Sequence, residues 1–245
     1  MFMNSQVRVH DFEERELASI ALAKEIAEQL NSSIIQKGIA TIALSGGSTP
    51  MLMLQALAKE NIDWDKVVVT LVDDRWVPES NARSNARFLS DHLFAQLNSP
   101  PTFIPLVPTP IADAPSQTQI DVIVQNYQSA TGISPEQIGF DVVVLGMGGD
   151  GHTASFFPDA DNISDLIDPQ STSPLLTCHS TSSVEPRITW SLPVLLRSTF
   201  LSLLMFGEDK KTVFNDAILL KDCEKLPIAS VIHQDQTDLN LFYAK

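Results

Sequence analysis

The chain has 245 residues, a hydrophobic content of 44% and a formal net charge of −14, with a pI near 4.6. This length can bury a full hydrophobic core, so we expect one domain over residues 1–245, either as a single unit or with a small lobe. So acidic a chain argues against nucleic acid or an anionic membrane as a partner, because either would need a basic face. An anionic ligand would have to meet the few cations gathered in one place.

The sequence also predicts where the protein works and whether it needs a metal. Residues 1–16 lack the long apolar run of a signal peptide, and no stretch approaches about 18 uninterrupted apolar residues, so we expect a cytoplasmic protein. Cys178 and Cys223 are too few and too far apart for a metal cluster or a disulfide framework. Because no His, Cys or carboxylate group has zinc-ligand spacing, we expect no metal.

The first part of the chain alternates between strand and helix patterns. We expect strands at 7–12, 39–44, 67–72 and 141–145, and helices at 13–30, 51–59, 84–97 and 117–130. Gly38 should close the first helix, and Thr49 should cap the second, with Pro50 at its first helical position. The proline-rich segment 98–116 is predicted to be an extended connection. Alternating strands and helices imply a mostly parallel sheet covered on both faces.

The second part is less regular. Residues 159–174 are polar and acidic, which predicts a surface excursion whose functional option is a lid. We expect strands at 175–179, 198–206, 227–232 and 239–243, and a helix at 212–220. No internal repeat or low-complexity segment interrupts this pattern.

A glycine-containing turn follows the second predicted strand and precedes a helix. It consists of Ser45, Gly46, Gly47, Ser48 and Thr49. Free N–H groups, the helix dipole and two hydroxyls converge at such a turn, which indicates an anion site. The turn lacks the Gly-Lys-Ser/Thr ending of a nucleotide P-loop, so a small phosphoester is a better guess than ATP. The alternative is a capped turn without a ligand.

The third predicted strand runs directly into Asp73, Asp74 and Arg75. Open α/β sheets bind their ligands at the carboxyl ends of strands, so these charges lie at the expected place for a site. An Asp-Asp-Arg run is also common as a solvated surface or an ion pair, and the sequence leaves both readings open.

The segment 146–158, GMGGDGHTASFFP, follows the fourth strand without a spacer. Its glycines let backbone N–H groups approach a ligand, and His152 stands at the strand-to-loop junction, where an imidazole can meet water and act as a base. Gly146, Gly148 and Gly151 also satisfy G-x-G-x-x-G, but Pro158 leaves room for only one or two helical turns, which disfavours a dinucleotide site. A structural turn is the remaining alternative.

Taken together, these loops resemble one known family. The motifs are SGGSTP at 45–50, DDRWVP at 73–78, Ser84-Asn85, GMGGDGHTASFFP at 146–158, Arg187-Ile-Thr189 and Gly207-x-x-Lys210. In this order and spacing they resemble 6-phosphogluconolactonase, in the superfamily that also holds glucosamine-6-phosphate deaminase. The resemblance implies a three-layer α/β/α fold with a mostly parallel, modified doubly wound sheet and no cofactor. It also implies hydrolysis of 6-phospho-D-glucono-1,5-lactone in the oxidative pentose phosphate pathway.

The resemblance lends roles to residues of this chain. His152 would take a proton from water as the water attacks the lactone C1, with Asp150 or Asp73 orienting the imidazole. The oxyanion would be held by Arg75 or by N–H groups of the glycine loops. The loop glycines concerned are Gly148, Gly149 and Gly151. A lactone is an activated ester, so no covalent nucleophile is needed.

The 6-phosphate is assigned to the turn 45–49 together with Arg187 and Lys210. Two rivals remain. A deaminase of the same superfamily would isomerise an amino sugar phosphate, but its pattern has Asp-Glu-Tyr where this chain has Asp73-Asp74-Arg75. A non-catalytic sugar-phosphate sensor could use the same phosphate turn, yet it would have no need for a histidine at the rim. The lactonase family usually has Asp-Glu-Arg at positions 73–75. This chain keeps the charges, but Asp74 has a shorter side chain than the usual Glu.

Overall fold

The computed structural model describes residues 7–109, 111–112 and 114–245. Residues 1–6, part of the stretch searched for a signal peptide, lie outside the described residues, as do 110 and 113 of the predicted connection. The helices and strands follow in the order β1 (Val7–Phe12), α1 (Arg15–Lys37), β2 (Ala40–Leu44), α2 (Met51–Leu57), β3 (Val67–Leu71), β4 (Asp73–Arg75), α3 (Asn85–His92), β5 (Thr102–Ile104), α4 (Gln117–Thr131), β6 (Phe140–Leu145), α5 (Ile163–Leu166), β7 (Leu175–Cys178), β8 (Arg187–Trp190), α6 (Leu192–Leu196), β9 (Ser198–Phe206), α7 (Glu208–Leu220), α8 (Ile228–Ile232) and β10 (Leu239–Ala244).

The large sheet has seven strands in the order β1-β10-β9-β6-β2-β3-β5, and neighbouring strands pair in parallel. The chain order reverses between β2 and β6: β3 and β5 extend the sheet on one side, and β9, β10 and β1 on the other. In open α/β sheets the loops at the carboxyl ends of the strands diverge at such a point and leave a crevice. Because the two glycine-rich segments follow β2 and β6, the fold places them side by side at that crevice.

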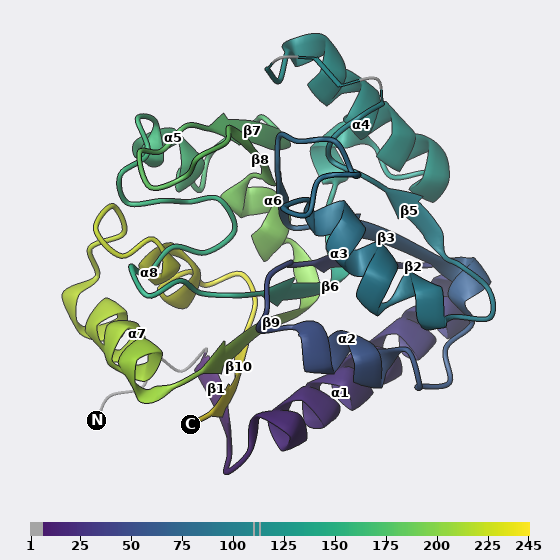
Figure 1. The fold of residues 1–245 in the computed structure, drawn as a ribbon, viewed down its shortest axis with the longest axis horizontal. Coiled ribbons are helices and arrows are strands. Elements are labelled where there is room, and N and C mark those ends of the chain that lie inside the picture. The colour runs from purple at the N-terminus through teal and green to yellow at the C-terminus, as the bar shows by residue number, and fades with distance from the viewer. Residues whose placement is uncertain (1–6, 110, 113) are drawn as a thin grey trace.

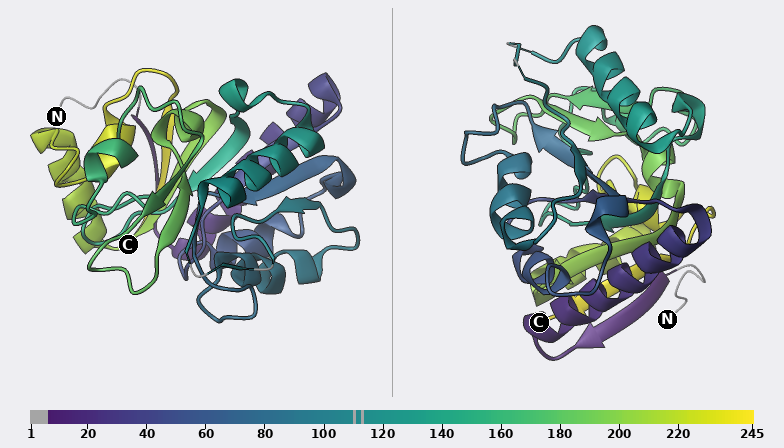
Figure 2. Two further views of the ribbon diagram at one scale, coloured as in Figure 1. Left: turned by 90° about the horizontal axis from the view of Figure 1, so that it is seen from above. Right: turned by 90° about the vertical axis from the view of Figure 1, so that its right-hand side faces the viewer.

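Helices cover both sides of this sheet, with α1 on one side and α4 on the other (Figures 1 and 2). α1 packs against β1, β2, β6, β9 and β10 and buries Leu22, Ile26 and Leu30 there. β2, β3 and β6 are buried along their whole length, as parallel strands covered on both faces must be. The predicted three-layer α/β/α architecture with a mostly parallel, doubly wound sheet is confirmed. None of the described helices is long and apolar enough to cross a membrane.

The predicted helix ends agree with the structure at Gly38 and differ at Thr49. Gly38 has a φ of 79° and donates its N–H to the carbonyl of Ile34, which ends α1 after Lys37 rather than after Leu30. Thr49 does not cap α2, because Pro50 is the residue that precedes the helix and no side chain accepts from its first turn. A cap reaches the amide two or three residues ahead, so Thr49 stands one position too early.

One predicted strand is a helix. The segment 227–232 was expected to be extended, but Ile228–Ile232 forms α8. A buried apolar run of this length cannot be assigned from its periodicity, since a short buried helix looks the same. The N–H of Ile228 donates to the carbonyl of Gly151, so α8 packs behind the glycine-rich loop.

A second, three-stranded sheet has the order β4-β8-β7 and was not predicted. β4 pairs antiparallel with β8, which sets Arg75 opposite Arg187 and Asp73 opposite Thr189. The charges that follow β3 are therefore part of a small sheet that joins them to Arg187. The predicted connection 98–116 also contains β5, which adds to the edge of the large sheet beside β3.

Candidate active site

A cavity of about 300 Å³ opens at the crevice between β2 and β6. Loops after both strands line it, together with β4, the first residue of α3, β8 and the start of α7. Of the site residues predicted from the sequence, it brings together Ser45, Gly46, Gly47, Ser48, Thr49, Asp73, Arg75, Gly148, His152, Arg187 and Lys210. Asp150, Gly149 and Gly151 belong to the same loop as His152 but do not line the cavity.

The turn after β2 is anchored at its first residue. Ser45 donates from its backbone N–H and its hydroxyl to the carbonyl of Val144 in β6, at 3.2 and 2.8 Å. Gly46 lies so close to Asn85 that a Cβ would come within 2.1 Å of Asn85 Oδ1. Gly47 has a φ of 91°, which glycine adopts without strain. The shape of the turn therefore requires both glycines.

His152 is held by Asp150 at the rim. Nδ1 of His152 lies 2.6 Å from Oδ1 of Asp150, and the backbone N–H of His152 donates to the same oxygen at 3.1 Å. The His152 side chain is 32% exposed, so water can reach the ring. Burial raises the pKa of Asp150, but the hydrogen bond and the charge of His152 outweigh it and leave that pKa lowered. Asp150 is therefore ionised beside the imidazole.

The glycines of this loop shape it and use some of their own amides. A Cβ on Gly148 would lie 2.2 Å from the His152 ring, so only glycine allows this approach. Gly148 donates its N–H to the carbonyl of His152, and Gly151 donates its N–H to the carbonyl of Gly148. Two of the amides expected to hold an oxyanion are thus already engaged within the loop.

Phe157 supports two functional side chains at once. Its buried ring lies 4.4 Å from the imidazole of His152, measured between centroids. The guanidinium carbon of Arg187 stands 5.1 Å from the centroid of the same ring. Phe157 therefore lies in contact with both the candidate base and one of the cavity's cations.

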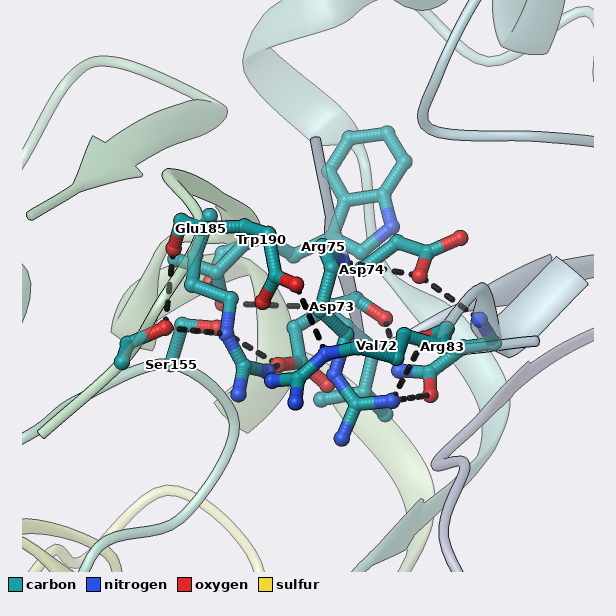
Figure 3. A network of polar contacts seen from close by, with 12 residues as sticks. Val72, Asp73, Asp74, Arg75, Arg83, Ser155, Glu185 and Trp190 are labelled. Atoms are coloured by element: carbon teal, nitrogen blue, oxygen red, sulfur yellow. Dashed lines mark hydrogen bonds and ion pairs between the residues drawn. The ribbon is translucent and has the colours of Figure 1, made fainter. Parts of the chain in front are cut away.

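Asp73 pairs with a cation and a hydroxyl. The hydroxyl of Ser155 donates to Asp73 Oδ2 at 2.5 Å, and Nη1 of Arg187 lies 3.3 Å from the same oxygen (Figure 3). Arg187 also donates from Nε to the hydroxyl of Ser183 at 2.9 Å. Of the two carboxylates considered for orienting His152, Asp150 is the one that contacts the ring, while Asp73 orients Arg187.

Arg75 forms the neighbouring part of the cationic wall. Its Nη1 donates to Asn85 Oδ1 at 3.0 Å and to the carbonyl of Arg83 at 2.6 Å. Arg83 is itself held by Glu185, with 2.7 Å between Nε and Oε1 (Figure 3). Burial lowers the pKa of Arg75, and the charge of Arg187 lowers it further. Two guanidinium groups that repel each other at a partly buried cavity wall favour an anionic ligand.

Asp74 lies behind this wall rather than in it. Its Oδ1 accepts from the backbone N–H groups of Arg75 and Asn85 at 2.8 and 2.7 Å, and its Oδ2 accepts from Ala86 at 3.2 Å. Burial raises the pKa of this carboxyl to about 6, although its amide donors act in the opposite direction. Asp74 therefore anchors the first turn of α3.

Lys210 lines the cavity from α7. It stands in the first turn of α7, and its Nζ donates to the carbonyl of Met147 at 2.6 Å. Burial lowers the pKa of Lys210, while the charge of Asp150 raises it in part. Cations from three separate elements thus surround the cavity, and within the described residues no group of three or more His, Cys, Asp or Glu side chains is placed to hold a metal.

Several residues of this site have no role predicted from the sequence. Asn85 belonged to a recognised motif but had no function assigned, and Phe157 was read only as part of the glycine-rich segment. Ser155 was not expected to act as a nucleophile, because it is not in a G-x-S-x-G elbow. A polar residue directly after the helix-capping Ser84 was the one available signal for Asn85. Contacts such as those of Phe157 leave no mark in the sequence, because they depend on the three-dimensional arrangement of the loops.

Comparisons with known proteins agree with this arrangement. The family described as Glucosamine-6-phosphate isomerases/6-phosphogluconolactonase matches residues 13–240. A 6-phosphogluconolactonase of Mesorhizobium japonicum is 37% identical over 95% of this chain and 93% of its own length. One of Rhizobium meliloti is 34% identical over 96% and 98%. The crystal structure of a 6-phosphogluconolactonase from Shewanella baltica superimposes with a TM-score of 0.89 and 30% identity, covering both chains completely.

The fold defines an α/β protein with a cavity at the switch point of a doubly wound sheet. The chain belongs to the glucosamine-6-phosphate isomerase/6-phosphogluconolactonase family. Its similarity to the relatives named 6-phosphogluconolactonase extends over nearly the whole length of each chain.

Proposed function

We propose that the cavity hydrolyses 6-phospho-D-glucono-1,5-lactone to 6-phospho-D-gluconate, a step of the oxidative pentose phosphate pathway. Full-length homology to proteins named 6-phosphogluconolactonase supports this activity. The observation that carries the catalytic assignment is the pairing of His152 with Asp150 at the rim of a cavity lined by Arg75, Arg187 and Lys210.

His152 acts as the general base in this proposal. With Nδ1 turned to ionised Asp150, the neutral ring carries its proton there and leaves Nε2 to receive one from water. The water oxygen bonds to C1 of the lactone, and the bond between C1 and the ring oxygen then breaks. The imidazolium returns its proton to that leaving oxygen, and Asp150 stabilises the charged ring in between.

Arg75 stabilises the negative carbonyl oxygen that forms at C1. Its guanidinium lines the cavity, whereas the amides of Gly148 and Gly151 already donate within their loop. A preorganised cation at the developing charge is among the strongest contributions available to an active site. The phosphate lies on the turn 45–49 with Arg187 and Lys210, and Arg187 is the neighbour of Arg75 across β4 and β8. Together these cations let an acidic protein accept an anionic sugar.

The test is acid release from freshly made 6-phosphogluconolactone, corrected for spontaneous hydrolysis. Replacing His152 with Ala should lower kcat by roughly 10²- to 10⁴-fold with little change in substrate binding, as loss of positioned proton transfer does. His179→Ala is the matched control, because this histidine is exposed and does not line the cavity. A folded His152→Ala protein that keeps more than half of the wild-type kcat ends the assignment.

A further inference from the structure

Asn85 occupies the centre of the polar wall, although no step of the proposed reaction uses it. Its Oδ1 accepts from Arg75 Nη1 at 3.0 Å, and its Nδ2 donates to the backbone carbonyl of Asp73 at 2.8 Å. Gly46 packs directly on its side chain. The buried Asn85 therefore contacts three parts of the site: the turn after β2, the backbone of β4 and the Arg75 guanidinium.

Helix α3 does not need the side-chain amide of Asn85 as its N-terminal cap. Ser84 supplies that cap, since its hydroxyl accepts from the N–H of Arg87. The backbone N–H of Asn85 is satisfied by Asp74 at 2.7 Å. With the first turn of α3 anchored by these two residues, the Asn85 side chain is held in one place and serves the cavity.

Arg75 needs a restraint of this kind. Its Nε is buried and makes no hydrogen bond within the described residues, and the like charge of Arg187 stands near it. The two acceptors that hold the guanidinium, Asn85 Oδ1 and the carbonyl of Arg83, both bind the same nitrogen, Nη1. Without Asn85, the guanidinium keeps one of these two hydrogen bonds, to the carbonyl of Arg83, and its position is set by repulsion from Arg187 and attraction to Asp73 and Asp74.

We propose that Asn85 is a positioning residue: it fixes the Arg75 guanidinium against the β4 backbone and the Gly46 turn so that Nη2 meets the carbonyl oxygen of the bound lactone. This inference rests on the proposed function. A single amide thereby sets the spacing between the cation at the reacting carbonyl and the turn assigned to the phosphate.

A double-mutant cycle tests this role. Asn85→Ala is made in the wild-type protein and in Arg75→Ala, and kcat and KM for 6-phosphogluconolactone are measured for all four proteins. The loss of one hydrogen bond to a charged group should lower kcat/KM roughly 10- to 100-fold in the wild-type background, mainly through kcat. If Asn85 acts through Arg75, the same change should cost less than about threefold once Arg75 is absent.

Two further variants control for a loss of folding and for the structural cost of removing a buried hydrogen bond. Asn85→Leu fills about the same space without polar groups. It replaces Asn85→Ala in the cycle if the Asn85→Ala protein does not fold. Asn162→Ala is the matched control, because Asn162 also donates from Nδ2 to a backbone carbonyl, that of Thr177, away from the cavity. Its thermal midpoint reports the structural cost of losing such a bond, and its kcat/KM should stay within about twofold of wild type.

The outcomes separate this inference from the proposed function. A wild-type protein that does not hydrolyse the lactone overturns both. A wild-type protein that does, with Asn85→Ala either fully active or equally damaging in both backgrounds, overturns the positioning role alone. A loss seen only when Arg75 is present supports it, provided that the folded fraction of each variant has been measured by its unfolding curve.

Discussion

Lys210 and Lys211 are neighbours in α7 but belong to different surroundings. Lys210 lines the cavity and donates to the carbonyl of Met147. Lys211 lies over the ring of Tyr243 at 4.2 Å and 3.4 Å from a carboxylate oxygen of Asp11. Because they share their chemistry and differ in position, the pair separates a local phosphate contact from a general effect of charge.

Lys210→Ala should lower kcat/KM for the phosphorylated lactone roughly 10- to 100-fold, since one charged hydrogen bond is worth about 1.5 to 3 kcal/mol. It should lower kcat/KM for unphosphorylated gluconolactone far less. Arg187→Ala should show the same loss of discrimination, with a lower stability as well, because Asp73 then loses its buried cation.

Lys211→Ala is the control and should retain the wild-type preference for the phosphorylated substrate. Steady-state kinetics with both lactones give the comparison directly. Unchanged preference in both Lys210→Ala and Arg187→Ala would place the phosphate elsewhere in the cavity.

At the scale of single residues, the sequence predicted which side chains line the cavity wherever a motif directly follows a strand. His152 and Arg75 could be predicted as neighbours, since parallel strands bring their carboxyl ends to one edge. The partner of His152 could be narrowed only to Asp150 or Asp73, because both loops reach the same crevice. What separates them is the side-chain geometry, in which Asp73 pairs with Arg187 instead.

Helix α3 is held at its first turn by a carboxylate that the structure buries. Asp74 accepts three backbone N–H groups there, and its pKa is raised to about 6. A carboxyl group with a raised pKa binds its proton more tightly in the folded state than in the unfolded state. Its contribution to the free energy of unfolding is therefore largest at low pH and declines as the pH rises from about 4 to about 6.

Asp74→Asn should remove this pH dependence. The amide oxygen can still accept from Arg75 and Asn85, which share one carboxylate oxygen in the wild type. As the pH rises through this window, the free energy of unfolding of the variant should increase relative to that of the wild type, by up to about 3 kcal/mol. This figure follows from about 1.4 kcal/mol for each tenfold difference in proton affinity between the folded and unfolded states. Urea unfolding at about pH 4.5, 5.5, 6.5 and 7.5 measures the difference.

Asp235→Asn, at an exposed position, serves as the control and should shift the unfolding free energy by a constant amount. A stability difference between Asp74→Asn and wild type that does not change between about pH 4 and 7 would contradict the raised pKa. It would also mean that the three amide donors fully offset the burial of the carboxylate.

Among the elements, the long periodic segments were predicted, and so were the short strands β2, β3 and β7, whereas α8 and β4 were not. α1, α4, β6 and β9 follow from patterns that repeat over several turns or fill a strand with β-branched residues. The helix at 228–232 was mistaken for a strand because one apolar turn carries no period. The separation of β4 from β3 was missed as well, since Asp73–Arg75 changes sheets only through its pairing with β8.

For the whole molecule, the distribution of charge and the reactivity of a lactone both favour hydrolysis without a metal. The chain has a net charge of −14, yet its cavity gathers cations from β4, β8 and α7. A lactone carbonyl is reactive enough for an imidazole base, so activity should stay within about twofold of its starting value after exhaustive treatment with EDTA. Chelator-sensitive activity that zinc restores would contradict this expectation.

The same preparation should release no ammonia from glucosamine 6-phosphate. The family also contains isomerases. The resemblance described above implies a tyrosine in their pattern where this chain has Arg75, and this difference favours the lactone as substrate. A coupled ammonia assay run beside the lactone assay gives the comparison. Ammonia release without lactone hydrolysis would assign the chain to the isomerase branch.

The position of β10 has a consequence for how the chain is made. β10, residues 239–244, lies between β1 and β9. The first strand of the chain, β1, therefore cannot pair within the sheet until the last strand, β10, has been made. Until residue 244 has left the ribosome, β9 keeps an open edge and β1 has no partner, and exposed edges of this kind invite pairing between chains. A message cut short before codon 239 would therefore produce an aggregating polypeptide rather than a weakened enzyme.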